Sequence, residues 1–330
     1  MADASCIPDP SPRHRVSGHG LSQTVPVSRT LNLARAVAIV LLVTVPRVAA
    51  ADPLADRIAA LTKDFKGTVS IYAKNLDSGR DFALNADAKV RTASTIKLPI
   101  LCALEALVAD GRLSWTTPVT LRAEDKVSGS GVMGELSVGT TLPMRDVATL
   151  MIVVSDNTAT NLVLDRITPD AVNDFMDSLG LPATRSMRKI RGDGTALKPA
   201  EGWSRAGRLP GNQRFGIGSS TPREMVTLLE RLEQGKVVSA AASMDVIGML
   251  KRQQYKTGIG RRAGAGTEVA SKSGALDALR SDVGIAYTPG GRIAMAITVD
   301  DMPAVDYSPD NAGEGLIWEM AKVLMTGLAK

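Results

Sequence analysis

The order of strand-like and helix-like segments is the feature that most limits how this chain can fold. Thr68 to Lys74 alternates as a strand does, and the other clear strand-like runs come only after residue 267. From Ser94 to about Arg166 the apolar residues fall mostly at helical spacing, and helical segments recur up to Gln253. Strands at both ends of the chain must share one sheet. The predicted class is α/β (α+β), a sheet flanked by helices with a mostly helical lobe inserted.

Turn-forming residues separate the predicted elements. Asp77-Ser78-Gly79 predicts a hairpin, and Pro289-Gly290-Gly291 joins the last two strands. The glycine-rich stretch from Thr184 to Ser220 far exceeds the roughly 12 to 15 residues beyond which structureless loops become uncommon, so we expect it to shape a site. The predicted helices are Pro53 to Lys63, Pro169 to Leu179, Pro222 to Glu233, Ser239 to Gln253 and about Gly313 to Leu328; the late strands are Glu268 to Ser271, Ser281 to Tyr287 and Arg292 to Asp300.

The N-terminal segment has the features of a cleaved bacterial-type export signal. An apolar run from Ala36 to Val45 follows Arg29 and Arg35, and the small residues at 48–51 suit cleavage near residues 50–52. At ten residues the run is too short to span a bilayer. We therefore expect residues 1–51 to be a leader and the rest to be periplasmic or secreted. Residues 1–28 are polar, so either the n-region is unusually long or the true start lies downstream.

Histidine is absent after the leader, because the only two histidines are His14 and His19. This excludes a Ser-His-Asp triad, histidine zinc ligands and histidine bases. Five of the 39 Lys and Arg and two of the 34 Asp and Glu also lie in residues 1–51, which leaves a net charge of only +2. So weakly charged and aromatic-poor a domain does not indicate nucleic-acid binding. Cys102, the remaining cysteine, is expected to be a buried thiol.

Ser94-Thr95-Ile96-Lys97 places a hydroxyl and an amine three positions apart, on the same face of a helix. Pro99 marks the first turn of that helix, because proline is tolerated where backbone N–H groups have no intrahelical partner. The free N–H groups and positive dipole end there favour a developing oxyanion. A buried Lys97 with a lowered pKa can take the serine proton. Alone, the same pattern also fits a serine N-cap followed by a solvated lysine.

Two further motifs follow. Ser155-Asp156-Asn157 comes after an apolar helical run, and its hydroxyl can relay a proton while its amide contacts a substrate amide; it is equally good N-cap chemistry for a following helix. Lys272-Ser273-Gly274 ends a predicted edge strand, where an ammonium and a hydroxyl can dock a carboxylate and the glycine lets a substrate backbone approach. Lys256-Thr257-Gly258 has a similar pattern, but we interpret it as a helix C-terminus with a glycine cap.

Ser94-x-x-Lys97, Ser155-Asp156-Asn157-Thr158-Ala159-x-Asn161 and Lys272-Ser273-Gly274, taken together, resemble the motif set of class A β-lactamases and penicillin-binding proteins. The resemblance covers nearly all of residues 52–330, and the 61 positions from Ser94 to Ser155 are similar to the class A spacing. It implies a five-stranded antiparallel sheet lobe at about 52–92 and 235–330. A helical lobe would occupy about 93–234, with the active site between the two lobes.

The resemblance also implies residue roles. Ser94 is the acylated nucleophile, Lys97 the base or proton relay, and Ser155 the proton shuttle. The backbone N–H groups of Ser94 and Ala275 form the oxyanion hole. The substrate-binding residues are Asn157 for an amide, and Lys272, Ser273, Gly274 and Arg280 around a carboxylate.

One departure from the family pattern bears on hydrolysis. Class A enzymes carry a Glu-x-x-Leu-Asn segment whose glutamate positions the water that frees the acyl-enzyme, and no such segment exists here. Ungapped matching puts a residue near Ile190 at that position. Asp193 or Glu201 could substitute if the loop folds back, although a solvated loop carboxylate is the alternative for each.

These observations predict a secreted serine hydrolase that opens β-lactam amides through an acyl-enzyme on Ser94, with slow deacylation. The alternatives are a D-Ala-D-Ala peptidase or other amide or ester acyl-transfer enzyme, and a β-lactam-binding protein that stays acylated. The expected partner is a small-molecule β-lactam or D-Ala-D-Ala-like peptide, without nucleic acid or a stable membrane span, and the chain is expected to act as a monomer. No metal or organic cofactor is implied.

Overall fold

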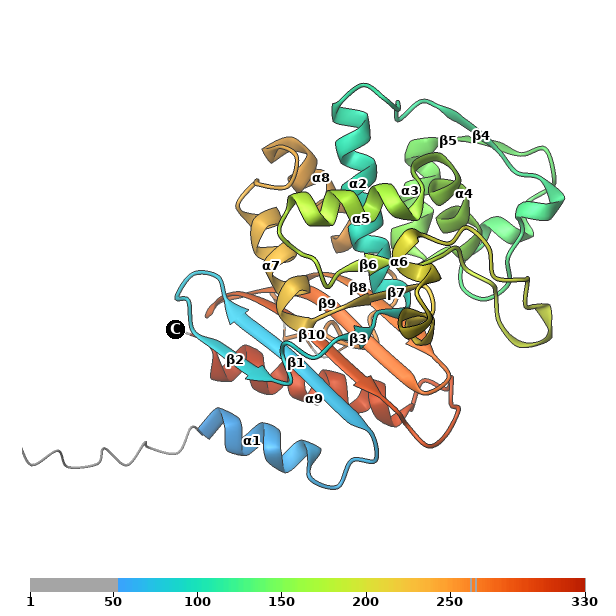
Figure 1. Cartoon of the computed structure of the whole chain (residues 1–330). Coiled ribbons are helices and arrows are strands. Elements are labelled where there is room, and N and C mark those ends of the chain that lie inside the picture. Colours follow the sequence, from blue (N-terminus) through green and yellow to red (C-terminus); the bar gives the residue numbers. More distant parts are fainter. Residues whose placement is uncertain (1–52, 262, 265, 330) are drawn as a thin grey trace, which may run out of the picture. The chain divides into compact units, whose positions relative to one another are not determined.

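The computed structural model describes residues 53–261, 263–264 and 266–329, so the predicted leader lies outside the described residues. One antiparallel sheet of five strands organises this part of the chain, in the order β2-β1-β10-β9-β8 (Figure 1). Its strands are β1 (Thr68–Asn75), β2 (Asp81–Leu84), β8 (Glu268–Leu276), β9 (Leu279–Thr288) and β10 (Gly291–Asp300). The main helices are α1 (Pro53–Thr62), α2 (Lys97–Ala109), α3 (Met144–Val153), α4 (Asn157–Ile167), α5 (Pro169–Ser178), α7 (Pro222–Glu233), α8 (Ala240–Lys251) and α9 (Ala312–Gly327).

The sheet joins the two ends of the described chain, as the sequence predicts. β1 pairs with β10 over its whole length, from Thr68 opposite Asp300 to Asn75 opposite Ile293. The predicted hairpin at Asp77-Ser78-Gly79 is confirmed, because β1 also pairs with β2. The five-stranded antiparallel β-lactamase-like sheet implied by the resemblance is therefore present.

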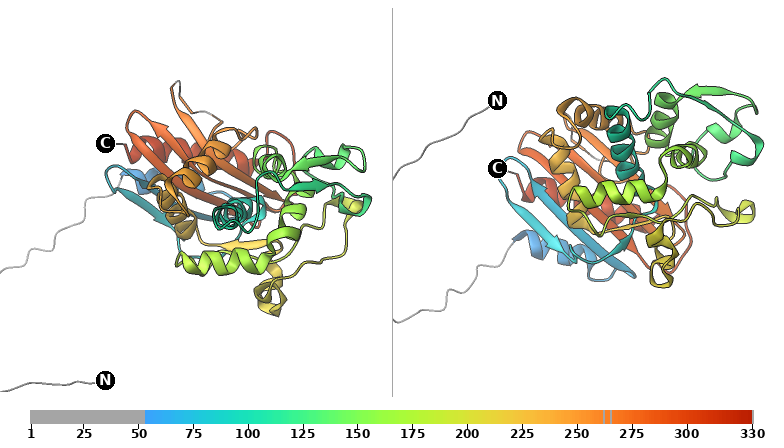
Figure 2. Two further views of the ribbon diagram at one scale, coloured as in Figure 1. Left: turned by 90° about the horizontal axis from the view of Figure 1, so that it is seen from above. Right: turned by 45° about the horizontal axis from the view of Figure 1, so that its top comes forward.

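Helices cover both faces of the sheet (Figures 1 and 2). On one face, α1 and α9 pack against alternate residues of β10, among them Ile293, Met295 and Ile297. The intervening Ala294 and Ala296 point to the other face, toward α7 and α8. Because side chains alternate along a strand, this register decides which β8 residues can reach the helical part of the chain. Lys272 has the same parity as Ala270, which packs on the helical side.

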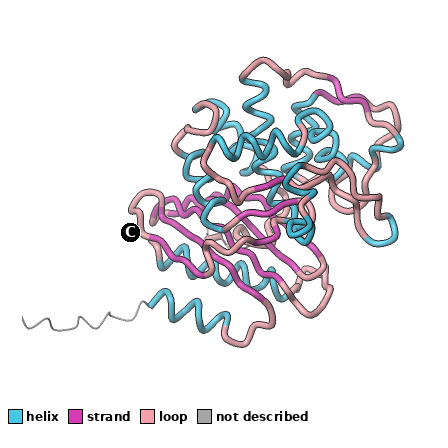
Figure 3. Tube along the Cα trace, in the orientation of Figure 1, coloured by secondary structure: helices cyan, strands magenta, loops and turns pink. Residues whose placement is uncertain are grey.

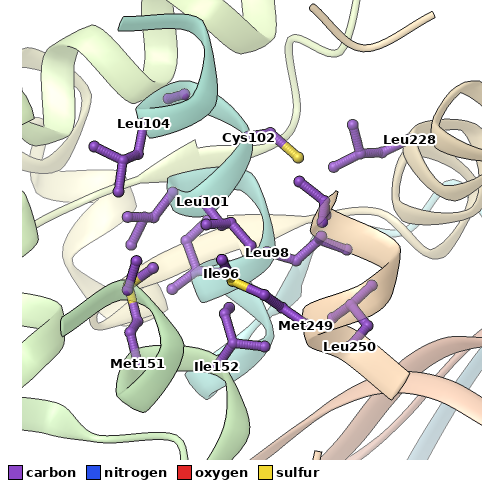
Figure 4. Close-up of a cluster of buried hydrophobic side chains, with 14 of the residues drawn as sticks. Ile96, Leu98, Leu101, Cys102, Leu104, Met151, Ile152, Leu228, Met249 and Leu250 are labelled. Carbon is purple, nitrogen blue, oxygen red and sulfur yellow. The ribbon is translucent and has the colours of Figure 1, made fainter. Parts of the chain in front are cut away.

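Helix α2 is apolar on all sides apart from Lys97 and Glu105. Every residue from Lys97 to Glu105 is buried. Figure 4 shows the cluster in which Leu98, Leu101 and Cys102 of α2 meet side chains of α3, α7 and α8. Cys102 is fully buried, as predicted. A rigid, buried helix thus holds the segment that begins at Ser94.

The predicted loop from Thr184 to Ser220 is not structureless (Figure 3). It contains the short strands β6 (Arg185–Ser186) and β7 (Gly218–Ser220), which pair with each other, and β7 also pairs with β3 (Val90–Arg91). It also contains the one-turn helix α6 (Arg205–Arg208). A further two-stranded sheet joins β4 (Pro118–Thr120) to β5 (Thr141–Pro143). The small β3-β7-β6 sheet ties both ends of the long segment to the residues just before Ser94.

Two local predictions are wrong. The strand expected to stop at Ser271 continues to Leu276, so Lys272, Ser273 and Gly274 lie within edge strand β8. Gly258 is no helix cap, because α8 ends at Lys251; a Cβ on Gly258 would lie 2.4 Å from Asp282 Oδ2, so glycine is needed for close packing there. In the described part of the chain, no helix combines the length and apolarity needed to cross a membrane.

Candidate active site

Ser94 lies in a 3-10 turn, Ala93–Ile96, that continues directly into α2. Ala93 has a φ of 46°, a left-handed conformation that is unfavourable for a residue with a Cβ and that turns the chain sharply before Ser94. Gly274 of β8 packs against this turn. A Cβ at Gly274 would lie 2.8 Å from Thr92 O and 3.0 Å from Ser94 N. Glycine is therefore needed here for close packing of β8 on the turn, and Gly274 also lines the cavity in front of Ser94, so its predicted role in substrate binding stays a prediction.

Lys97 follows one turn after Ser94 and is fully buried. Its Nζ lies 2.5 Å from Ser155 O, 2.9 Å from Asn157 Oδ1 and 3.2 Å from Ser155 Oγ. Burial, reinforced by the charge of Lys272, holds the Lys97 pKa well below its usual value, and Asp156 opposes the shift. A neutral Lys97 can donate to the two carbonyl oxygens and still keep a lone pair for a hydroxyl proton.

Ser155 connects the two lysines. Lys272 Nζ donates to Ser155 Oγ at 2.9 Å and to Ser273 O at 2.7 Å. Burial lowers the Lys272 pKa to about 7, against the effect of the Asp282 charge. The structure therefore brings all three sequence motifs together around one hydroxyl, which lies between an amine on α2 and an amine on β8.

The loop that carries Ser155 is fixed by its neighbour. Asp156 caps α4 by accepting from Ala159 N, and it also accepts from Val132 N and Met133 N. Ser155 has a φ of 53°, so its orientation depends on these bonds rather than on a relaxed backbone. The N-cap interpretation of this motif is confirmed through Asp156. It is compatible with the catalytic interpretation, which stays a prediction, because Ser155 and Asn157 face the lysines.

A cavity of about 790 Å³ opens in front of these groups. Its lining includes six of the residues predicted from the sequence: Ser94, Ser155, Asn157, Ser273, Gly274 and Ala275. Arg280 also lines it, but this guanidinium donates to the carbonyls of Leu276, Leu279 and Asp306 and lies 3.6 Å from Glu314. The predicted carboxylate-binding role of Arg280 gains no support from contacts that hold it inside the wall.

The second wall of the cavity is formed by residues 188–193. Asn161 fixes it with two bonds, from its Nδ2 to Ile190 O at 3.0 Å and from Ile190 N to its Oδ1 at 2.7 Å. Ile190 lines the cavity, where ungapped matching places the missing glutamate. Asp193 also lines the cavity but is exposed, whereas Glu201 is outside the lining and pairs with Lys189 at 3.1 Å.

Sequence reasoning missed two polar groups of the site. Ser130 Oγ donates to Ser155 O at 2.9 Å, and Ser130 O accepts from Asn157 N, so Ser130 supports the loop that carries Ser155. The run of small residues from Ser128 to Gly131 was the available signal in the sequence. Asp282 lines the cavity from β9, accepts from Ile259 N at 2.8 Å, and has a pKa raised to about 6 by burial. An acid within an apolar strand pattern could have marked it.

Comparisons with known proteins agree with this geometry. The model of the β-lactamase enzyme family, Beta-lactamase2, matches residues 53–327. Beta-lactamase AST-1 of Nocardia asteroides is 29% identical over 295 residues, which cover 85% of this chain and 84% of that protein. Beta-lactamase SME-1 of Serratia marcescens is 26% identical over 57% of this chain, and the match spans 60% of that protein.

Solved structures extend the likeness to the whole fold. The β-lactamase from Sphaerobacter thermophilus DSM 20745 superposes with a TM-score of 0.71 at 31% identity, covering 83% of this chain and 96% of that one. PBP-A superposes with a TM-score of 0.69 at 26% identity, covering 83% and 94%. With the family model spanning most of the chain and the three motifs meeting at one cavity, this protein belongs to the class A β-lactamase family.

Proposed function

We propose that this chain is an exported serine hydrolase that opens β-lactam amides through an acyl-enzyme on Ser94, and that the acyl-enzyme is hydrolysed slowly. The observation that carries the proposal is the Ser155 hydroxyl, held between Lys97 and Lys272 at the floor of a cavity that Ser94 lines. Family membership and the β-lactamase relatives support the choice of substrate.

In the acylation step, Ser94 Oγ attacks the lactam carbonyl carbon while neutral Lys97 accepts the hydroxyl proton. The developing oxyanion is bound by the N–H groups of Ser94 and Ala275. The C–N bond breaks as Ser155 gives its proton to the leaving nitrogen, and the lysine network restores that proton. Lys272 in its ammonium form, with the Ser273 hydroxyl, holds the substrate carboxylate.

Deacylation is the step that this chain is least equipped to perform. The Ile190 side chain has no proton acceptor, and Glu201 is paired away from the cavity. Asp193 lines the cavity but is exposed, and no motif supports it as a base. General acid–base assistance contributes about 10²–10⁴ in rate, so a site without this base acylates and then stalls.

The lack of a proton acceptor at Ile190 favours a second function, in which the acyl group passes to an amine or to another nucleophilic acceptor. A D-Ala-D-Ala peptidase or a related transferase acting on amides or esters fits that description. A β-lactam-binding protein that remains acylated is the limiting case without an acceptor.

The experiment is an intact-mass time course of residues 52–330 mixed with benzylpenicillin, with Ser94→Ala in parallel. We expect an adduct on the unmodified chain that persists as free penicillin is exhausted, and no adduct on Ser94→Ala. An adduct that clears within seconds while product accumulates would overturn slow deacylation. Labelling of Ser94→Ala at an unchanged rate would overturn the site itself.

A further inference from the structure

The wall formed by residues 188–193 carries two arginines on either side of Ile190. Arg188 and Arg191 both line the cavity that Ser94 lines. Arg188 is partly buried and stacks over the Trp203 ring, with its Cζ 5.5 Å from the ring centroid. Ile190 between them is fixed through Asn161, so the two arginines stand on a constrained segment rather than on a free loop.

Neither guanidinium pairs with a carboxylate of the described chain. Arg188 Nη1 donates to Lys189 O at 2.8 Å, and Arg191 Nε donates to Lys198 O at 3.1 Å. Two of the nearby acids are committed elsewhere, because Lys189 pairs with both Asp165, at 2.9 Å, and Glu201, at 3.1 Å. The third, Asp193, is exposed on the same wall and forms no ion pair with either arginine in the described chain. Most of the N–H groups of the two arginines therefore have no protein acceptor among the residues that the structure describes.

The two guanidinium groups line one cavity and repel each other. Burial, reinforced by the charge of Arg191, lowers the pKa of Arg188. A carboxylate placed between them would remove that repulsion and accept charge-assisted hydrogen bonds, bidentate ones included. Guanidinium groups suit this planar anion better than they suit a neutral amide.

We propose that Arg188 and Arg191 form a second anion subsite on the acyl side of the cavity, so that the preferred substrate carries a carboxylate on its acyl portion in addition to the carboxylate held at Lys272 and Ser273. This inference rests on the proposed function for the identity of the acylated group. It names the substrate class as dianionic amides, and it explains why this wall carries arginines on both sides of Ile190.

The test compares benzylpenicillin with its α-carboxy derivative, two probes that differ by one carboxylate on the acyl side chain. The measured quantity is the ratio of their second-order acylation rate constants, obtained by intact mass. We expect a ratio of about ten in favour of the α-carboxy compound, which corresponds to about 1.4 kcal/mol. In Arg188→Met/Arg191→Met the ratio should fall to about one. A loss of activity that affects both penicillins equally cancels in this ratio, so the ratio reports on recognition of the extra carboxylate and not on the folding of the variant.

Arg214→Met is the matched control, because it removes the same charge from the same loop at a position that does not line the cavity, and it should keep the full ratio.

Arg191→Met alone should lower the ratio about threefold. Its guanidinium makes one carbonyl contact, so the single variant still tests the proposal if the double variant misfolds. A ratio near one in the unmodified protein, or a full ratio in the double variant, would overturn the subsite.

A second measurement separates this proposal from the proposed function. If neither penicillin acylates Ser94, the proposed function fails, and the subsite is then tested by calorimetric titration with phenylmalonate and phenylacetate, the free side-chain acids of the two probes. We expect the dicarboxylate to bind at least tenfold more tightly than the monocarboxylate, and the difference to vanish in Arg188→Met/Arg191→Met. Equal binding of the two acids to the unmodified protein contradicts the subsite.

Discussion

The two walls of the cavity differ in how completely their polar groups are bonded. Behind the wall that Ser94, Ser155 and Ser273 line, Lys97 and Lys272 are fully buried and share Ser155. The wall built from residues 188–193 instead presents an isoleucine and two arginines without carboxylate partners in the described chain. Under the proposed function, this difference separates the formation of an acyl-enzyme from its release. We infer that the chain has the groups for the first step and lacks a base for the second.

Of the changes proposed here, removal of the Lys97 amine behind the wall that Ser94 lines should have the largest effect on the rate of acylation. Lys97→Met keeps most of the side-chain volume but deletes the proton acceptor for Ser94, so we expect acylation by benzylpenicillin to slow by about 10²–10⁴. Lys236→Met, at an exposed position outside the cavity lining, is the control and should acylate at the normal rate. Normal acylation of Lys97→Met, measured by intact mass, would show that this wall does not hold the base.

The pH dependence of acylation tests the other lysine of that wall. Lys272 holds the substrate carboxylate only as an ammonium, and its pKa is lowered to about 7 by burial. The second-order acylation rate constant of the free enzyme should therefore fall by up to about tenfold per unit as the pH rises above 7. Lys272→Arg keeps its charge at high pH and should remove that decline. An unmodified enzyme that acylates faster at pH 9 than at pH 7 would contradict this assignment.

The support of the second wall can be tested with a matched pair of asparagines. Asn161 holds Ile190 by two backbone bonds, and Asn173 holds Ser186 in the same way, with Nδ2 to Ser186 O at 3.0 Å and Ser186 N to Oδ1 at 2.7 Å. Replacement of either by alanine should destabilise the fold by about 1–3 kcal/mol, measured by urea unfolding, because buried backbone groups lose partners. Only Asn161→Ala should alter the lifetime of the acyl-enzyme. Equal lifetimes in the two variants would mean that the wall does not govern release.

The smallest expected effect concerns a buried acid at the far end of α2. Glu105 is 5% exposed; burial, reinforced by the neighbouring Asp245 carboxyl group that pairs with Arg145, raises the pKa of Glu105 to about 8. In the folded chain the pKa of Glu105 lies above its ordinary value of 4.5, so protonated Glu105 stabilises the fold at low pH. This stabilisation is lost as the pH rises toward and through about 8. Glu105→Gln should raise Tm by a few degrees at pH 9 relative to the unmodified chain, and a lower Tm there would contradict the raised pKa of Glu105.

Much of the first wall could be predicted from the sequence because its chemistry lies in short motifs. Ser94-x-x-Lys97 depends on helical spacing, and Lys272 depends on strand parity, both of which are local properties. The packing role of Gly274 could not be predicted, since its close neighbour is a backbone turn from a distant segment that contains Thr92 and Ser94. Ser130 and Asp282 were missed for the same reason, because their partners come from distant segments. The conformation of the second wall, residues 188–193, depends on tertiary contacts such as those of Asn161 with Ile190. The sequence alone therefore showed only that the glutamate is absent.

The most direct test of the difference between the walls is to place a carboxylate at Ile190 and measure both steps in one experiment. Intact-mass time courses of Ile190→Glu and of its neutral control Ile190→Gln with benzylpenicillin give the acylation and deacylation rate constants separately. We predict acylation within about threefold of the unmodified chain for both variants, and deacylation that is about 10²-fold faster for Ile190→Glu alone. Equal deacylation by the two variants, or fast deacylation by the unmodified chain, would contradict the claim that this wall limits release.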